Sequence, residues 1–334
     1  MEEELTMLRQ IQRPYVIGMD IGSTITRFAI VNARGHIIES DMVNTRDYAT
    51  VYDFVPAICE KLNVMIEKVG GSDKIKAMGI GAPNANYYRN IIDRAMNLPW
   101  HDELPLAALL QDQLGITVGL TNDANATAVG EMYYGGARGL RNFVEITLGR
   151  GVGCGLVING QLVYGADGNA GEFGHICVRP EGRQCGCGLI GCVEAYCSAS
   201  GVVNTARQLL MESDKESLLS SVDINAMTSY DLYDAALKND PIAIEAFKEM
   251  GRVMGEGFAH LVNLLSPEAI ILQGGMVKTS DFWIDIAQET MLEHVLPVFR
   301  ENISLSVSEL NNKDAALLGA AAFAWELKEY KLFI

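Results

Sequence analysis

Three cysteines and one histidine form the densest group of reactive side chains in this sequence. Cys185, Cys187 and Cys192 fall within eight residues, and His175 precedes Cys185 by ten positions. The pattern His-x9-Cys-x-Cys-x4-Cys supplies one imidazole and three thiolates, a complete tetrahedral ligand set for zinc. Because four protein ligands leave no open position, we expect a structural Zn²⁺. Core thiols beside an exposed loop histidine are the alternative. The other cysteines are expected to be small buried residues: Cys59, Cys154, Cys177 and Cys197.

One aspartate is a candidate for chemistry of a different kind. The segment TNDANA at residues 121–126 places Asn122 and Asp123 directly before a helical run. Both residue types are favoured at helix N-termini, so a helix cap is the plain interpretation. The same place lets Asp123 act as the base that accepts a hydroxyl proton while that oxygen attacks a γ-phosphoryl group. The two interpretations are compatible, since a helix N-terminus favours an ionised carboxylate.

Two glycine turns have the composition needed to hold phosphates. The first turn, residues 20–24 (DIGST), and the second turn, residues 147–153 (TLGRGVG), each lie between two apolar runs. Backbone N–H groups of such turns approach phosphates closely, and a carboxylate such as Asp20 helps to place Mg²⁺ through water. Each turn alone is compatible with an ordinary β-hairpin. Together they predict a nucleotide clamp, to which Arg150 adds a positive charge.

Two glutamates flank the cysteine cluster. Glu172 and Glu194 each present a planar carboxylate that accepts hydrogen bonds from adjacent sugar hydroxyls, although solvated surface glutamates are the alternative. Residues 186–191 (GCGLIG) match G-x-G-x-x-G, but they are interleaved with the thiols and follow no strand of a βαβ unit, so a dinucleotide site is set aside. The absence of a G-x-x-x-x-G-K-[ST] segment excludes an ordinary P-loop.

These residues must be positioned by alternating strands and helices, which indicates an α/β fold. Two similar sets of strands, beginning near residues 15 and 142, suggest two halves built on one plan. Apolar periodicity predicts three strands within 15–43 and further strands at 75–81, within 142–165 and at 268–272. Helices are predicted at 48–69, 199–211, 229–237, 241–265, 281–294 and 314–331.

Composition limits the class of protein. A chain of 334 residues with 49% apolar and 20% charged residues is expected to form two globular domains. The formal net charge of −16 and the lack of any basic run argue against a nucleic acid partner. No apolar stretch reaches the ~20 residues that cross a bilayer. The N-terminus lacks the apolar core of a signal peptide, so we expect a cytoplasmic protein.

The motifs taken together resemble one family. DIGST, TNDANA, LGRGVGCGLVINGQLVYGADGNAGEFGH and CGCGLIGC are similar to the ROK family of repressors and kinases, from about residue 16 to residue 323. The resemblance implies a ribonuclease-H-like, actin-type α/β fold with ATP bound between two domains, and a homodimer. The implied smaller domain is 1–122 plus 313–334, and the implied larger domain is 123–312, with the zinc-bearing loop.

The resemblance also assigns residues to roles. Asp123 is the implied catalytic base, and His175 would place one ring nitrogen on zinc and donate to a sugar hydroxyl from the other. The implied ATP site is Asp20, Gly22, Ser23, Thr24, Thr147, Gly149, Arg150, Gly151, Gly153, Gly274 and Gly275. The implied sugar contacts are Asn84, Asn97, Asn122, Asp123, Glu172, His175 and Glu194.

Four positions depart from the family pattern. Ser23 stands where the family usually has glycine, Ile25 where a lysine often follows, Arg150 where threonine is common and Asn84 where glycine is frequent. The Arg150 change bears on phosphate binding, and the Asn84 change bears on the choice of sugar. The implied reaction is ATP-dependent phosphorylation of a hexose, with glucose at C6 expected first. N-acetylglucosamine, N-acetylmannosamine, fructose and allose are alternative substrates.

A regulator is the alternative of another class. Repressors of this family carry a helix-turn-helix domain ahead of the first phosphate strand, and only about fourteen residues precede that strand here, too few for such a domain. A sugar-binding sensor without catalysis is a third interpretation, which requires that the altered phosphate turns do not hold ATP.

Overall fold

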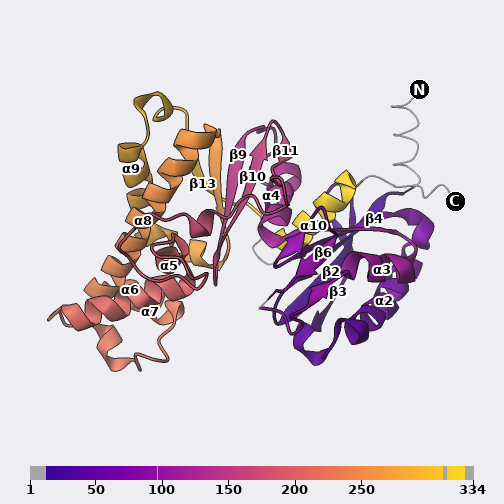
Figure 1. Ribbon diagram of the computed structural model, residues 1–334, viewed down its shortest axis with the longest axis horizontal. Coiled ribbons are helices and arrows are strands. Elements are labelled where there is room, and N and C mark those ends of the chain that lie inside the picture. Colours follow the sequence, from indigo (N-terminus) through magenta and orange to yellow (C-terminus); the bar gives the residue numbers. More distant parts are fainter. Residues whose placement is uncertain (1–12, 96, 311–313, 328–334) are drawn as a thin grey trace. The chain divides into compact units, whose positions relative to one another are not determined.

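The computed structural model describes residues 13–95, 97–310 and 314–327. Its internal contacts divide the chain into two units, each of which is an α/β structure (Figure 1). Unit 1 comprises Met1–Gly139, Gln161–Ala170 and Glu309–Ile334 as far as these are described, and unit 2 comprises Leu140–Gly160 and Gly171–Ser308.

The sheet of unit 1 combines a hairpin with parallel strands. Its order is β3-β2-β1-β4-β8, in which β2 pairs antiparallel with β1 and β3, whereas β1, β4 and β8 run parallel. The carboxyl ends of these three parallel strands therefore meet at one edge of the sheet. The strands are β1 (Tyr15–Ile21), β2 (Ile25–Asn32), β3 (Ile37–Asn44), β4 (Ile75–Ala82) and β8 (Thr117–Asn122).

Both faces of this sheet are covered. Ile17 and Met19 pack in one apolar core with α2 and α3, whereas Val16 and Ala29 pack in a separate core with α10. Neighbouring strand residues point to opposite faces, so α2 and α3 cover one face and α10 the other. The helices and remaining strands of unit 1 are α2 (Val51–Lys68), α3 (Leu106–Leu114), α4 (Asp123–Tyr134), α10 (Ala315–Glu326), β5 (Ala85–Asn86), β6 (Ile91–Asp93), β7 (Glu103–Leu104) and β11 (Gln161–Leu162), with short 3-10 turns η1 (Thr45–Asp47) and η2 (Ser72–Lys74).

Unit 2 repeats the strand plan of unit 1. Its strands lie in the order β10-β9-β12-β13. Of these, β10 pairs antiparallel with β9, whereas β9, β12 and β13 run parallel to one another. The second turn thus occupies the same place between β9 and β10 that the first turn occupies between β1 and β2, as the sequence predicts. These strands are β9 (Phe143–Leu148), β10 (Val152–Ile158), β12 (Ala269–Gln273) and β13 (Ser304–Val307).

The long helix α8 organises the core of unit 2. Asp240 caps it by accepting the N–H groups of Ile242 and Ala243, and Pro241 at its first position has no N–H to satisfy. Its apolar side packs with α6, α9 and the sheet. The helices are α5 (Glu194–Cys197), α6 (Ala199–Glu212), α7 (Ser229–Ala236), α8 (Pro241–Leu265) and α9 (Ile284–His294), with 3-10 turns η3 (Phe173–His175), η4 (Leu218–Ser221), η5 (Gly275–Phe282) and η6 (Pro297–Phe299).

Most expected elements are present, with three differences. The helix expected at 281–294 begins as η5 and becomes α-helical only at Ile284. The helix expected at 314–331 is α-helical to Glu326, and Lys331 lies outside the described residues. The sequence suggests a domain boundary near residue 123. The internal contacts instead place α4 in unit 1, because α4 packs on α10. Among the described residues no helix is long and apolar enough to cross a membrane.

Close backbone packing between β1 and α10 depends on a glycine, which gives a stability test. We expect Gly18→Ala to lower the free energy of unfolding by about 1–3 kcal/mol, as overpacking of a core does. The added methyl group would lie 2.5 Å from the Leu317 carbonyl oxygen and 2.8 Å from the Ala321 nitrogen, both in the helix backbone. Gly136→Ala is the control, since its nearest neighbour would be 3.9 Å away. Equal urea midpoints for the two variants would contradict this packing.

Candidate functional site

Two aspartates lie at the carboxyl edge of the unit 1 sheet. Asp20 pairs in register with Gly81 of β4, and Gly81 in turn with Thr121 of β8, so Asp20 and the start of α4 are two strands apart. Asn122 caps α4 by accepting the N–H of Ala124 at 2.8 Å, and Asp123 is the first helical residue. The predicted cap is therefore confirmed, and it leaves the Asp123 side chain exposed.

The two carboxylates affect each other. Burial, and then the negative charge of Asp123, raise the pKa of Asp20 from 3.8 to about 6, while Arg27 opposes the shift. A half-buried carboxylate next to a second one is a place where a cation would relieve repulsion. The pair thus suits a site at which positive charge gathers, such as magnesium with a nucleotide.

A buried threonine holds the first turn. Thr45 donates its N–H to the Thr24 carbonyl at 2.8 Å and its hydroxyl to the Gly22 carbonyl at 2.8 Å. The hydroxyl of Ser23 is buried and has no hydrogen-bond partner within the described part of the chain, which suits a ligand acceptor there. Sequence reasoning missed Thr45; the cap residue Asn44 just before it was the available signal.

The two asparagines assigned to the sugar by resemblance occupy exposed loops. Asn84 has a left-handed backbone with φ of 53°, and its side-chain amide donates to the carbonyl oxygen of Asp93 at 3.2 Å. It therefore stabilises its own loop. Asn97 lies exposed between β6 and β7. The structure gives neither residue a contact that defines a binding role.

The four predicted metal ligands converge in unit 2. The ligand atoms of His175, Cys185, Cys187 and Cys192 all lie within 4.8 Å of one another. His175 Nδ1 is 3.8 Å from Cys185 Sγ, and Cys187 Sγ is 3.8 Å from Cys192 Sγ. Tetrahedral ligands at the usual Zn–S length of about 2.3 Å would be about 3.8 Å apart, so the donor set and spacing fit zinc.

The surroundings shift the three thiols of the cluster in different directions. A backbone hydrogen bond from Leu189 lowers the pKa of the Cys187 thiol, whereas burial raises the pKa of the Cys185 and Cys192 thiols. On the other side of the imidazole, His175 Nε2 is 3.8 Å from the Glu172 carboxylate. Contrary to expectation, Cys177 is exposed, because it lies at the edge of the loop, opposite the buried Cys192 in an isolated bridge.

Glu194 joins the cluster to the second turn. One carboxylate oxygen accepts the Val152 N–H at 2.9 Å, and the other is 3.9 Å from Cys185 Sγ. The turn is closed by a hydrogen bond from Gly149 N–H to the Gly151 carbonyl at 3.0 Å. Unit 2 thus brings Glu172, His175 and Glu194 to the cysteine cluster and places the second turn against Glu194.

The other residues assigned to ATP lie in this turn or next to it. Thr147 donates its hydroxyl to the buried Glu145 at 2.8 Å, and Arg150 is exposed. Gly274, at the end of β12, has φ of 104°, and a side chain there would meet the Leu148 carbonyl. Glycine is therefore required at this position, as it is where backbone approaches backbone. Gly275 is exposed beside it, and Gly153 lies within β10.

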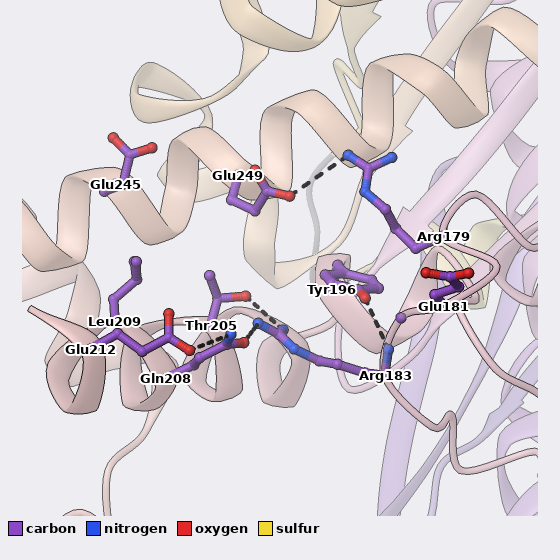
Figure 2. Close-up of a pocket in the computed structure, with 11 residues that line it drawn as sticks. Arg179, Glu181, Arg183, Tyr196, Thr205, Gln208, Leu209, Glu212, Glu245 and Glu249 are labelled. Atoms are coloured by element: carbon purple, nitrogen blue, oxygen red, sulfur yellow. Dashed lines mark hydrogen bonds and ion pairs between the residues drawn. The ribbon is translucent and has the colours of Figure 1, made fainter.

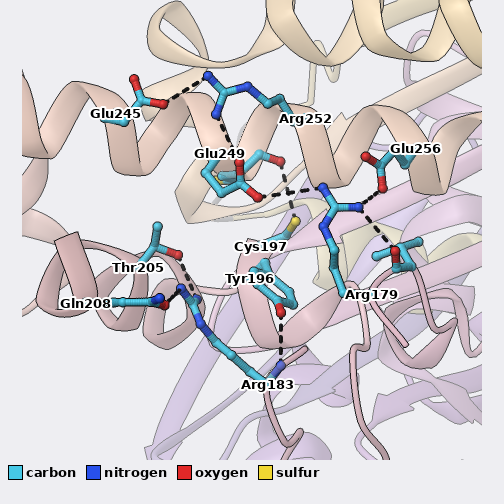
Figure 3. Close-up of polar contacts among 12 residues, drawn as sticks. Arg179, Arg183, Tyr196, Cys197, Thr205, Gln208, Glu245, Glu249, Arg252 and Glu256 are labelled. Atoms are coloured by element: carbon cyan, nitrogen blue, oxygen red, sulfur yellow. Dashed lines mark hydrogen bonds and ion pairs between the residues drawn. The ribbon is translucent and has the colours of Figure 1, made fainter. Parts of the chain in front are cut away.

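Two arginines anchor the metal loop, residues 175–192, to helices of unit 2. Arg179 pairs with Glu256 and, at 3.7 Å, with Glu249, both on α8. Arg183 donates to Thr205 Oγ1 at 2.7 Å on α6, and its guanidinium lies over the Tyr196 ring at 4.6 Å (Figure 3). The sequence predicts no role for either arginine, since their spacing does not indicate these partners.

These arginines line a polar cavity of about 460 Å³ between the metal loop, α6 and α8 (Figure 2). Its arginines are already paired with carboxylates or hydrogen-bonded to neutral side chains. None of the residues assigned to ATP or sugar lines it. The cavity is therefore part of the support of the loop rather than the candidate site.

Two α/β units with repeated hairpin-and-parallel sheets and glycine turns at matching places define the class of this protein. The chain belongs to the ROK family, which it matches over residues 16–326. It is 31% identical to a glucokinase of Halalkalibacterium halodurans, covering 94% of this chain and 95% of that protein. It is 26% identical to a xylose repressor of Caldicellulosiruptor bescii, covering 92% of this chain and 77% of that protein.

A solved relative gives the same fold. The ROK family glucokinase from Streptomyces griseus in complex with glucose and AMPPNP is 32% identical, with a TM-score of 0.75, covering 93% of this chain and 99% of that one. The fold expected from the motifs is thus confirmed as that of a ROK family protein with mixed α/β sheets.

The raised pKa of Asp20 predicts a pH-dependent stability. Between the ordinary value of 3.8 and about 6, the folded protein holds a proton that the unfolded chain releases, so stability falls as pH rises through this window. Asp20→Asn should therefore raise the free energy of unfolding by about 1–2 kcal/mol near neutral pH. The gain should vanish toward pH ~4. Urea titrations across this range test it, with the exposed Asp102→Asn as control; a pH-independent difference would contradict it.

Proposed function

We propose that this protein is an ATP-dependent hexose kinase whose first substrate is glucose, phosphorylated at C6. The observation that carries the proposal is the aspartate at the start of α4, capped by Asn122 and electrostatically coupled to Asp20. A ROK family relative that binds glucose and AMPPNP supports it.

Asp123 is the proposed base. Its place at the first helical position puts it at the positive end of the α4 helix dipole, which favours its negative charge. It accepts the proton of the sugar hydroxyl as that oxygen forms a bond to the γ-phosphorus of ATP. The bond between that phosphorus and the β–γ bridging oxygen breaks, and ADP leaves. Such transfer depends mainly on positioning and charge neutralisation.

The two glycine turns are the proposed phosphate contacts. Ser23 offers a buried hydroxyl in the first turn, and the second turn presents backbone N–H groups next to the exposed Arg150. Mg²⁺ supplies charge neutralisation for the phosphates when bound. Asp20 would hold the Mg²⁺ through water, since its carboxylate is half-buried and the negative charge of Asp123 lies nearby.

The cysteine cluster is proposed to hold one structural Zn²⁺ through His175, Cys185, Cys187 and Cys192. The convergence of the four ligand atoms supports this. The metal would fix the imidazole, so that His175 and the neighbouring Glu172 and Glu194 keep their orientation toward a sugar. All three lie within unit 2 beside the cluster.

Other substrates are tested alongside glucose. N-acetylglucosamine, N-acetylmannosamine and fructose are alternatives because Asn84 stands where the family often has glycine. A regulator without catalysis is the alternative of another class, motivated by the xylose repressor relative. ADP release with each sugar decides among these, since a sensor would bind sugar and release no ADP. A homodimer and a cytoplasmic location stay predictions.

Removal of the proposed base is the direct test. We expect Asp123→Ala to lower kcat by about 10²–10⁴-fold, the usual contribution of a positioned base. Sugar binding should remain detectable by calorimetry, because the glutamate and histidine contacts are untouched. Asp112→Ala, an exposed aspartate on α3, is the matched control. Turnover near that of the unmodified protein would refute the role of Asp123.

Loss of one thiol tests the metal site. Cys187→Ser should release most of the roughly one zinc expected per chain. It should also weaken sugar binding, because His175 would lose its fixed orientation. Elemental analysis and calorimetry measure the two effects. Cys177→Ser is the control, since Cys177 is an exposed loop thiol outside the ligand set; equal zinc content in the two variants would rule out the proposed site.

A further inference from the structure

A glycine of the second turn faces a carboxylate rather than open space. A Cβ atom added at Gly151 would lie 2.6 Å from Glu194 Oε2, and among the described residues, apart from the chain neighbours of Gly151, only Glu194 has atoms within 4 Å of it. The backbone of Gly151 does not lie in the left-handed region. A Cβ added at Gly149, at the other end of the same turn, would meet nothing within 4 Å. A side chain at position 151 would therefore displace the Glu194 carboxylate, and no strain of the local backbone would oppose it.

The Glu194 carboxylate is held at one oxygen and lies beside the metal loop at the other. Oε2, the atom nearest Gly151, accepts the Val152 N–H at 2.9 Å. Oε1 lies 3.9 Å from Cys185 Sγ. The carboxylate thus spans the second turn and the metal loop, and its direction depends on both.

The helix that carries Glu194 is fixed from the other side. The hydroxyl of Tyr196 accepts the Arg183 N–H at 2.9 Å, and the guanidinium of Arg183 covers its ring (Figure 3). Cys197 donates its thiol to the Met250 carbonyl of α8 at 3.6 Å. Because α5 is tied to the loop and to α8, a methyl group at position 151 would turn the carboxylate aside instead of moving the helix.

We propose that Gly151 is a positioning residue for the sugar: it leaves the space in which Glu194 directs its carboxylate at sugar hydroxyls. This rests on the proposed function, in which Glu194 accepts those hydrogen bonds. A glycine in a phosphate-type turn then determines sugar affinity through the carboxylate it faces, in addition to any phosphate contact of its backbone.

The test measures sugar binding in the absence of nucleotide, so that contacts of Gly151 with phosphates cannot affect the result. Gly151→Ala should raise the Kd for glucose by about tenfold, because a charged hydrogen-bond acceptor is misdirected. Gly149→Ala should keep the Kd of the unmodified protein, since it adds the same methyl group to the same turn without meeting Glu194. Urea midpoints confirm that both variants are folded.

A double-mutant cycle identifies the cause. Glu194→Asp shortens the side chain and makes room for the methyl group, so Gly151→Ala should weaken sugar binding less in the Glu194→Asp background than alone. Full additivity of the two changes would overturn the proposal. So would a Gly151→Ala variant that binds glucose normally and AMPPNP weakly, because the glycine would then serve only the phosphates. If the unmodified protein binds no sugar of the panel, the proposed function fails, and this inference with it.

Discussion

A half-buried carboxylate beside a second carboxylate at one sheet edge is the main electrostatic constraint in unit 1. Parallel β1, β4 and β8 bring Asp20 and Asp123 to the same edge, where burial first, and then the charge of Asp123, raise the pKa of Asp20. The N-terminal end of α4 partly offsets the repulsion between the two carboxylates, because it presents N–H groups to Asp123. Proteins maintain such unfavourable charge pairs mainly where a ligand or metal relieves them, which links the cost in stability to the chemistry of the edge.

Local features of this fold could be predicted from the sequence. The hairpins around the two glycine turns and the cap at Asn122 depend on neighbouring residues, so composition and periodicity indicate them. The metal ligands could be predicted for a similar reason, since three of the four lie in one short loop and their donor chemistry is restrictive. The ROK family motifs then added the roles of residues that spacing alone leaves open.

The contacts that position these features are distant in sequence and could not be predicted. Thr45 reaches Gly22 across 23 residues, and Glu194 reaches Val152 across 42. Arg183 stands in a glycine-rich loop and finds its hydroxyl partner 22 residues later. Each is an ordinary residue whose role comes from which elements the fold places side by side, and a single sequence carries no periodic signal for that.

The distribution of thiols has a consequence for behaviour under oxidative conditions. Cys177 and Cys187 are exposed, whereas the other five thiols are buried, including Cys59, the single thiol of unit 1. Peroxide in solution would first encounter thiols in the segment that holds the proposed zinc ligands. Thiol oxidation would therefore begin in one loop of unit 2, beside the proposed zinc ligands and sugar contacts, before it reached the buried Cys59 of unit 1.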